Sequence, residues 1–446
     1  MSFAGSQNPR PFTADTIIAQ SIIYATYNPV FNPQKAKELG GTALELARKV
    51  NNREAEARAL WCLMLVEFHT GGDSQKVLAY GEKALAMARE LGLKELEGYV
   101  LGNLAWAYSL RVQLSEARQA NEEALEIWQA LGNLPMVVDA ISVKMGSLRF
   151  AGEYEDLLTT SSEAVRLSQS IGNALHHYMA LLFMGETHGV QGRFGQAFAC
   201  IEKAAAVSEE SGDERLLWGH LFYRLLAYIS GGFWGQAERL ADQLYADREE
   251  DKPIFQHYLL ANIAWTKIAL GKLREGEAIL KQAFSSIDQG APFSFTIVPL
   301  MVVDGHFQLA LENPKSALDR IGDVIYQLNQ FGARFYLAEL YWLQGKARLA
   351  LEETSQAKEA FLLAKKVAED TGERTILWQI LASLSDLENK SGNKLEAEKL
   401  LRQAQEIVRY IAENAGSDAL RDSFLAQPSV ARVLTGFLNV HVAGSA

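Results

Sequence analysis

Small residues recur along the chain at two related positions of a repeating unit. The first series returns every 39 to 41 residues, and the second follows it by seven residues in every unit. Seven residues make two turns of an α-helix, so both series occupy one helical face, where small side chains let a neighbouring helix approach closely. The first series is Ala36, Val77, Ala117, Leu157, Ala197, Ala237, Gly276, Ala317, Ala357 and Ala397, and the second is Ala43, Ala84, Ala124, Ala164, Ala204, Leu244, Ala283, Val324, Ala364 and Ala404.

Helix breaks recur with the same period. Glycine is favoured just past a helix end, where the backbone φ turns positive. One set of glycines is expected to end the first helix of each unit (72, 152, 192, 232, 271 and 392), and another to end the second (92, 132, 172, 212, 332 and 372). The pattern predicts an all-α chain of ten helical hairpins between about Phe12 and Gly416. One hairpin cannot bury its apolar face, so the units must stack.

The hairpin resembles the tetratricopeptide repeat (TPR). Two segments carry the resemblance, Gly98–Leu125 and Leu181–Ala204, and an aromatic residue stands three positions before the first small residue at Tyr154, Phe194 and Trp234. The resemblance implies an α-solenoid, a right-handed superhelix of about ten TPR-like hairpins. Units of 40 residues resemble the sensor arrays of MalT-like activators and related signalling ATPases, and also LGN-type scaffolds. The segment Ala412–Leu434 is similar to the C-terminal ends of the ATPase-linked arrays.

The expected organisation has three parts. Residues 1–12 form a flexible N-terminal segment, residues 13–416 form the solenoid, and residues 417–446 form capping helices and a tail, since a terminal repeat needs a cap. Two irregular stretches interrupt the period, at 247–253 and at 290–299, where Pro292 and Pro299 delay or kink a helix. Each stretch is read as a long loop, with a hinge between two arms as the alternative.

Composition narrows the function classes. The apolar fraction of 48% supports a continuous core, and the net charge of −11 with no basic run argues against a nucleic-acid partner. No segment has the length of a signal peptide or a membrane span, so a cytoplasmic location without membrane insertion is expected. The two cysteines, Cys62 and Cys200, are expected to be buried thiols.

Motifs for catalysis and cofactors are missing. The sequence has no phosphate-binding G-x-x-x-x-G-K-[ST], no H-E-x-x-H, no C-x-x-C and no G-x-S-x-G, and no two of its eight histidines are four residues apart. We therefore expect no metal, no cofactor and no enzymatic activity.

In the TPR family the first helix of each hairpin lines a concave groove, and this resemblance selects candidate binding residues. They combine aromatic and charged side chains, as recognition grooves do, although each aromatic taken alone is better explained by packing between adjacent first helices. The candidates are Tyr99, Trp106, Arg149, Glu186, Tyr258, Trp265, His306, Trp342 and Lys346. The function expected is a non-catalytic scaffold that binds a protein or peptide. The alternative is a sensor of a small ligand, such as an oligosaccharide, as in MalT-like systems.

Overall fold

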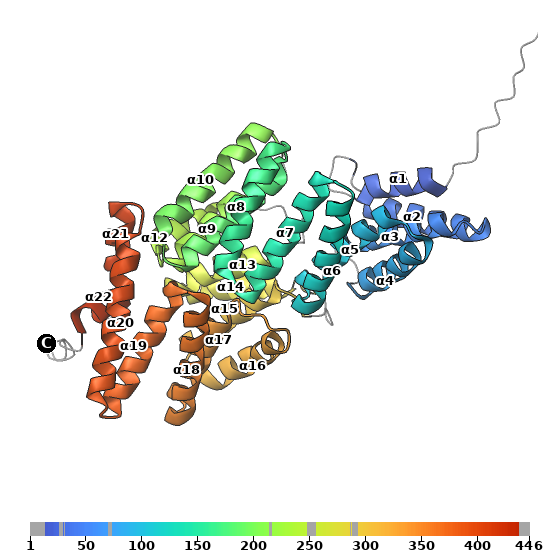
Figure 1. Cartoon of the computed structure of the whole chain (residues 1–446). Coiled ribbons are helices and arrows are strands. Elements are labelled where there is room, and N and C mark those ends of the chain that lie inside the picture. The colour runs from blue at the N-terminus through green and yellow to red at the C-terminus, as the bar shows by residue number, and fades with distance from the viewer. Residues whose placement is uncertain are drawn as a thin grey trace, which may run out of the picture. The chain divides into compact units, whose positions relative to one another are not determined.

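The structure is a computed structural model that describes residues 14–25, 30, 32–69, 74–213, 216–247, 256–285, 287 and 293–436. Within these residues every regular element is a helix (Figure 1). The helices are α1 (Ala14–Ala25), α2 (Pro33–Lys49), α3 (Arg53–His69), α4 (Ser74–Leu91), α5 (Lys94–Leu110), α6 (Leu114–Ala130), α7 (Leu134–Ala151), α8 (Tyr154–Ser170), α9 (Ala174–Val190), α10 (Phe194–Ser211), α11 (Gly219–Ser230), α12 (Trp234–Ala246), α13 (Gln256–Ala269), α14 (Leu273–Ser285), α15 (Ile297–Ala310), α16 (Pro314–Gln330), α17 (Leu337–Ala350), α18 (Thr354–Thr371), α19 (Arg374–Lys390), α20 (Lys394–Glu413), α21 (Asp418–Leu425) and α22 (Pro428–Thr435).

The predicted fold class is confirmed for the described residues. Helices α1 to α20 form ten successive hairpins, and each hairpin packs on the next. Both series of small residues lie on the second helix of each hairpin and are buried throughout. The protein is therefore built as an α-solenoid of TPR-like hairpins. Residues 1–12, expected to be flexible, lie outside the described part.

Glycine ends the helices where the period predicts it. Eleven of the twelve predicted glycines have positive φ, between +61° and +84°, and the remaining one, at position 72, lies outside the described residues. Units that lack glycine at these positions place another residue in the same left-handed conformation: Asn51, Val112, Glu312 and Glu352, with φ between +53° and +62°. The backbone conformation is thus set by the repeat, even where the residue type does not favour it.

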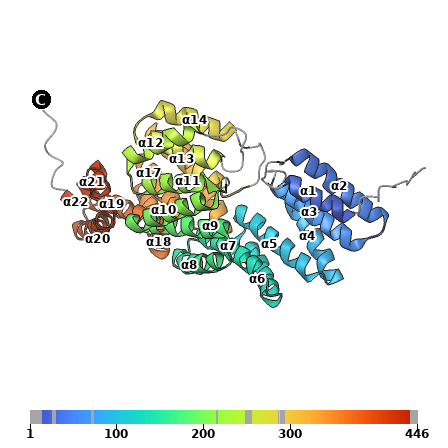
Figure 2. The same ribbon diagram turned by 90° about the horizontal axis from the view of Figure 1, so that it is seen from above.

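The hairpins divide into two compact units, and α7 contributes to both (Figure 2). Unit 1 comprises Met1–Ser109 and Ser115–Val143, and unit 2 comprises Leu110–Leu114 and Lys144–Ala446. In unit 1 the helices pack through alanine, leucine and valine, and Trp128 is its largest fully buried side chain. The division expected from the sequence treats residues 13–416 as one solenoid and does not include the boundary between Val143 and Lys144.

Unit 2 closes on itself. The amides of Arg334 and Phe335 both donate to the carbonyl of Phe150, at 2.9 and 3.2 Å. The amide of Gly195 donates to the carbonyl of Asn414 at 2.9 Å, and a Cβ on Gly195 would stand 3.1 Å from the Cα of Gly416. These contacts join helices α7 to α12 to helices α17 to α22. We call this line of contacts the seam.

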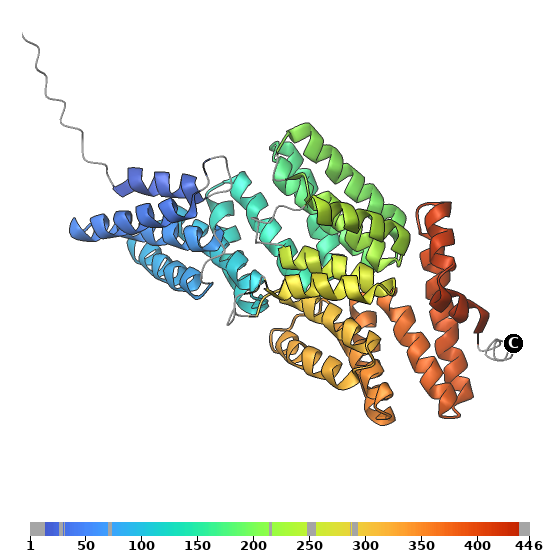
Figure 3. The ribbon, with the colours of Figure 1, turned by 180° about the vertical axis from the view of Figure 1, so that it is seen from behind.

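The C-terminal helices α21 and α22, drawn in the darkest red, complete the seam (Figure 3). Phe424, Val430 and Val433 are buried against the last hairpin, and the side-chain amide of Gln427 donates to the carbonyl of Gly231 at 3.2 Å. Leu420 and Leu434 are only partly buried there. The segment expected as a cap therefore covers the last hairpin and also reaches the turn between α11 and α12.

The two irregular stretches are described only in part. Asp247 ends α12, but residues 248–253 lie outside the described part, as do 290–292 with Pro292. Pro299 is the third residue of α15, which begins at Ile297. Proline is tolerated in the first turn of a helix, so it marks a delayed helix start as predicted, and the hinge remains a prediction.

Candidate functional site

Unit 2 contains a cavity of about 400 Å³ that is partly open to solvent. The first helix of each hairpin in this unit contributes to its wall, namely α7, α9, α11, α13, α15, α17 and α19. Residues of α21 and α22 close one side, where Phe424, Gln427 and Ser429 line it. The seam brings the two ends of the TPR-like array together, so its concave surface narrows here to a pocket that stays partly open to solvent.

Six of the nine candidate residues line this cavity: Arg149, Glu186, Trp265, His306, Trp342 and Lys346. They approach it from five different helices. Four lining positions, Glu186, Leu226, His306 and Lys346, are separated by multiples of 40 residues, and Trp265 departs from this register by one. Equivalent positions of these first helices thus face the cavity, which explains why the 40-residue period identified residues that line it. That these residues bind a ligand remains a prediction.

Arg149 is held by a buried ion pair. Its Nε and Nη2 donate to Glu186 Oε2 and Oε1 at 2.6 and 2.7 Å, and Nη2 also donates to the Tyr258 hydroxyl at 3.0 Å. Burial is the largest effect and disfavours the charged guanidinium, but Glu186, Tyr258 and Tyr223 together outweigh it, so the pKa of Arg149 lies well above its ordinary value. The hydrogen-bonding groups of Arg149, Glu186 and Tyr258 therefore pair with one another, and the bidentate Arg149–Glu186 pair fixes the positions of these side chains at the cavity wall.

The other candidates form a chain of rings. Trp265 lies against His306 with centroids 3.9 Å apart, and His306 lies 6.1 Å from Trp342. Lys346 Nζ stands 4.4 Å above the Trp342 ring, a cation–π distance. Trp265 is partly exposed, whereas Trp342 is 9% exposed and donates from Nε1 to Ser383 Oγ at 2.9 Å. Trp342 therefore has a packing role as well as a place in the cavity wall.

His306 is hydrogen-bonded to a residue that the sequence argument missed. Its Nε2 lies 2.7 Å from Glu339 Oε1. Burial lowers the pKa of His306, and Glu339 offsets only part of this effect, so the imidazole is neutral at pH 7 and Nε2–H donates to the carboxylate. Glu339 lies one repeat before another lining residue, Gln379. The same 40-residue period, read two turns earlier in the helix, would have identified it.

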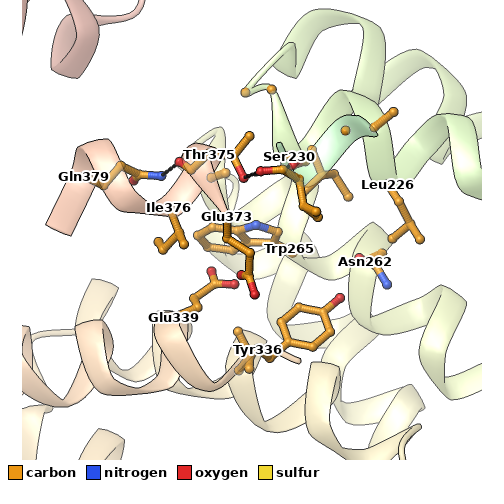
Figure 4. Close-up of a pocket in the computed structure, with 18 of the residues that line it drawn as sticks. Leu226, Ser230, Asn262, Trp265, Tyr336, Glu339, Glu373, Thr375, Ile376 and Gln379 are labelled. Atoms are coloured by element: carbon orange, nitrogen blue, oxygen red, sulfur yellow. Dashed lines mark hydrogen bonds between the residues drawn. The ribbon is translucent and has the colours of Figure 1, made fainter. Parts of the chain in front are cut away.

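Glu373 is the second residue that was missed. It stands in the turn before α19 and lines the cavity, where its side chain points inward together with Glu339, Tyr336 and Trp265 (Figure 4). It is 8% exposed, and its Oε1 has no hydrogen-bond partner among the described residues. Nothing in the sequence distinguishes this glutamate from the many solvated ones at helix starts, because its burial arises only when the seam closes.

The environment of Glu373 disfavours a negative charge. Its pKa is raised to about 7, mainly by burial and further by the carboxylates of Glu339 and Glu186, while a hydrogen bond with Thr371 acts in the opposite direction. The neighbouring Arg374 offers no compensation. Its guanidinium lies over the Tyr410 ring at 4.6 Å and donates to the Gln191 carbonyl at 3.5 Å.

Three candidates do not line the cavity: Tyr258 is buried in unit 2 beside Arg149, whereas Tyr99 and Trp106 belong to unit 1. Tyr99 stacks on Trp61 with centroids 5.3 Å apart and meets Trp128 edge-on at 4.8 Å. Trp106 packs partly buried against the same apolar cluster. Both contribute to packing between adjacent hairpins, which is the alternative that their aromatic type left open.

Among the described residues, no group of three or more His, Cys, Asp or Glu side chains is placed to hold a metal ion. In the same part of the chain, no helix is long and apolar enough to cross a membrane.

Fold and site together define a helical-repeat protein whose concave surface holds a partly open cavity. No protein-family model matches the chain, and no curated protein matches it. Among solved structures it is similar to the apo form of the quorum sensor NprR from B. thuringiensis, with 14% identity, 81% of this chain and 99% of that chain covered, and a TM-score of 0.46. It is also similar to a Rap protein complexed with competence and sporulation factor, with 14% identity, coverage of 90% and 88%, and a TM-score of 0.39. Likenesses this distant carry no argument about function.

Proposed function

We propose that the protein is a non-catalytic receptor that binds a peptide, or an exposed segment of a protein, in the cavity of unit 2. The observation that supports this most directly is the convergence of six aromatic and charged candidates on one cavity from five helices. The cavity volume, about 400 Å³, falls within the range of about 300–1,000 Å³ that ligand sites occupy. It suits the end of a peptide or one or two inserted side chains better than a long extended strand.

The test is selection of peptides from a random-sequence display library by the immobilised full chain, followed by calorimetric titration of the selected peptides. The Trp265→Ala variant removes a partly exposed ring from the cavity wall and should weaken binding by about 1–3 kcal/mol with little loss of stability. Tyr326→Ala is the matched control, because Tyr326 is 61% exposed on α16 and does not line the cavity. Selected peptides that bind the Trp265 variant as tightly as the wild type would contradict the proposal.

The finer resemblance to MalT-like sensor arrays leads to a second arm of the same experiment. Titration with oligosaccharides measures the alternative directly. If an oligosaccharide binds the wild type but not the Trp265→Ala variant, and no peptide is selected, the protein is a small-ligand sensor and not a peptide receptor.

A further inference from the structure

The wall of the unit 2 cavity contains a buried hydrogen-bond acceptor that lacks a donor among the described residues. Of the side chains that line it, Glu373 alone has a buried polar atom without a hydrogen-bond partner among the described residues, and that atom is an acceptor. A buried acceptor left unpaired costs free energy, so such an atom in a cavity points to a donor that arrives with a ligand.

The charged groups around Glu373 come from every helix packed near it. Arg149 from α7 is already paired with Glu186 from α9. Tyr154 from α8 also interacts electrostatically with Glu373. Glu339 from α17 accepts from the neutral His306, and Lys346 from the same helix is exposed and lies over the Trp342 ring. When Glu373 is ionised, the carboxylates of Glu186, Glu339 and Glu373 outnumber the cations Arg149 and Lys346.

The walls beside these carboxylates are aromatic. Trp265, Tyr336 and Trp378 line the same cavity, and Figure 4 shows Trp265 and Tyr336 with the two acidic side chains. Aromatic faces attract cations, and carboxylates bind ammonium and guanidinium groups through charge-assisted hydrogen bonds. Sugars and anions would not supply the positive charge that is missing.

We propose that this cavity recognises an organic cation, an ammonium or guanidinium group carried by the bound peptide, through Glu373 and Glu339 with Trp265 and Tyr336 packed against it. This inference rests on the proposed function and specifies its ligand. The cation pairs with the unpartnered Oε1 of Glu373 and shares the charge of Glu339. It therefore binds best when Glu373 is ionised, and a proton leaves Glu373 as the cation enters.

The experiment uses small probes and the full chain. Acetyl-arginine amide and acetyl-lysine amide represent side-chain cations, leucine amide represents a free peptide N-terminus, and acetyl-norleucine amide is the neutral control. Binding is measured by ligand-observed NMR and calorimetry. We expect at least one cationic probe to bind and the norleucine probe to bind at least about tenfold more weakly, since a charge-assisted contact is lost. The probe that binds identifies the source of the cation.

Glu373→Gln should weaken the cationic probe by about tenfold, and Glu339→Gln should weaken it as well. Glu369→Gln is the matched control, because Glu369 lies one turn earlier on α18 at an exposed position outside the cavity. A second measurement needs no variant. With a free Glu373 pKa of about 7, the affinity of the arginine probe should rise by about tenfold between pH 6 and pH 8, with proton release at pH 6.

Binding of the neutral probe as tightly as the cationic ones, no binding of any probe, or unchanged affinity in Glu373→Gln would each overturn the inference. Selected peptides that depend on Trp265 but not on Glu373 would leave the receptor role standing and refute the cation site. Cationic probes that depend on Glu373, with no peptide selected, would support the cation site and refute the peptide receptor.

Discussion

Individual residues in this protein accept conformations and environments that their chemistry disfavours, because the repeat imposes them. Glu312 and Glu352 occupy the left-handed region where other units have glycine. Glu373 is buried without a cation beside it. In each case one residue has an unfavourable conformation or environment, and the surrounding helices keep the geometry of the repeat.

Replacing Glu312 by glycine should stabilise the protein. A side chain in the left-handed region costs about 1–2 kcal/mol, and glycine returns part of that as greater freedom of the unfolded chain, so a net gain of about 0.5–1 kcal/mol is expected. Chemical denaturation measures it. Glu359→Gly, at an exposed position inside α18, should instead cost about 1 kcal/mol. Destabilisation by both substitutions would show that the turn carries no strain.

Glu373→Gln should change how stability depends on pH. Because the folded-state pKa of about 7 lies above the unfolded value, the carboxyl favours folding when protonated, and its contribution is lost as pH rises from about 4.5 to 7. The variant should match the wild type near pH 5 and exceed it by roughly 2 to 3 kcal/mol at pH 8. Denaturant melts of both proteins across this range test it. Burial also raises the pKa of Asp139 to about 6, but Asp139 is present in both proteins. Its contribution therefore cancels when the unfolding free energy of the wild type is subtracted from that of the variant. A constant difference at all pH values would contradict the burial of an ionisable Glu373.

At the scale of the element, the helical hairpin follows from local sequence. Small residues on the second helix and glycine after each helix are properties of about 40 consecutive residues, so the sequence alone predicts ten hairpins and their breaks. Gly185 illustrates how close the two helices of one hairpin are. A Cβ there would stand 3.2 Å from the carbonyl oxygen of Ala197 and 3.1 Å from the side chain of Ile201.

Ala197→Trp should therefore destabilise unit 2 by at least about 3 kcal/mol, because its site is fully buried between α9 and α10 and has room only for a methyl group. Gln196→Trp, one residue earlier and exposed, should change stability by no more than about 0.5 kcal/mol. Thermal melts monitored by circular dichroism compare the two. Equal melting temperatures would mean that the hairpin can open to admit a large side chain.

At the scale of the whole molecule, the sequence predicts less. The seam depends on how much curvature accumulates over seven hairpins, which no local pattern records. The period selected the cavity positions Glu186, His306 and Lys346, since they repeat with the helices. The period could not identify Glu373, because this residue lies in a turn. It could not predict the division into two units either, because the repeat continues through the boundary.

Removing residues 417–446 should destabilise unit 2 and promote aggregation. The deletion uncovers the apolar surface beneath Phe424, Val430 and Val433 and removes the Gln427 contact with Gly231. A lower melting temperature and binding of a hydrophobic dye are the expected results. Deletion of residues 437–446 alone retains all of these contacts and serves as the control. A monomeric truncated chain with an unchanged melting temperature would show that α21 and α22 do not act as a cap.

The seam also sets an order of events during synthesis. Hairpins form from contacts between neighbouring residues, whereas Thr375 donates to the Val190 carbonyl 185 residues away, and Gln427 reaches Gly231 across 196 residues. Contacts of such long range form late, because the intervening chain must first be ordered. While the ribosome is still translating the last hairpins, the earlier ones are already folded around a half-open basin. The wall formed by Gln427 and Ser429 is completed last, so an interrupted chain would be expected to hold most of the lining residues in a wider, more open pocket.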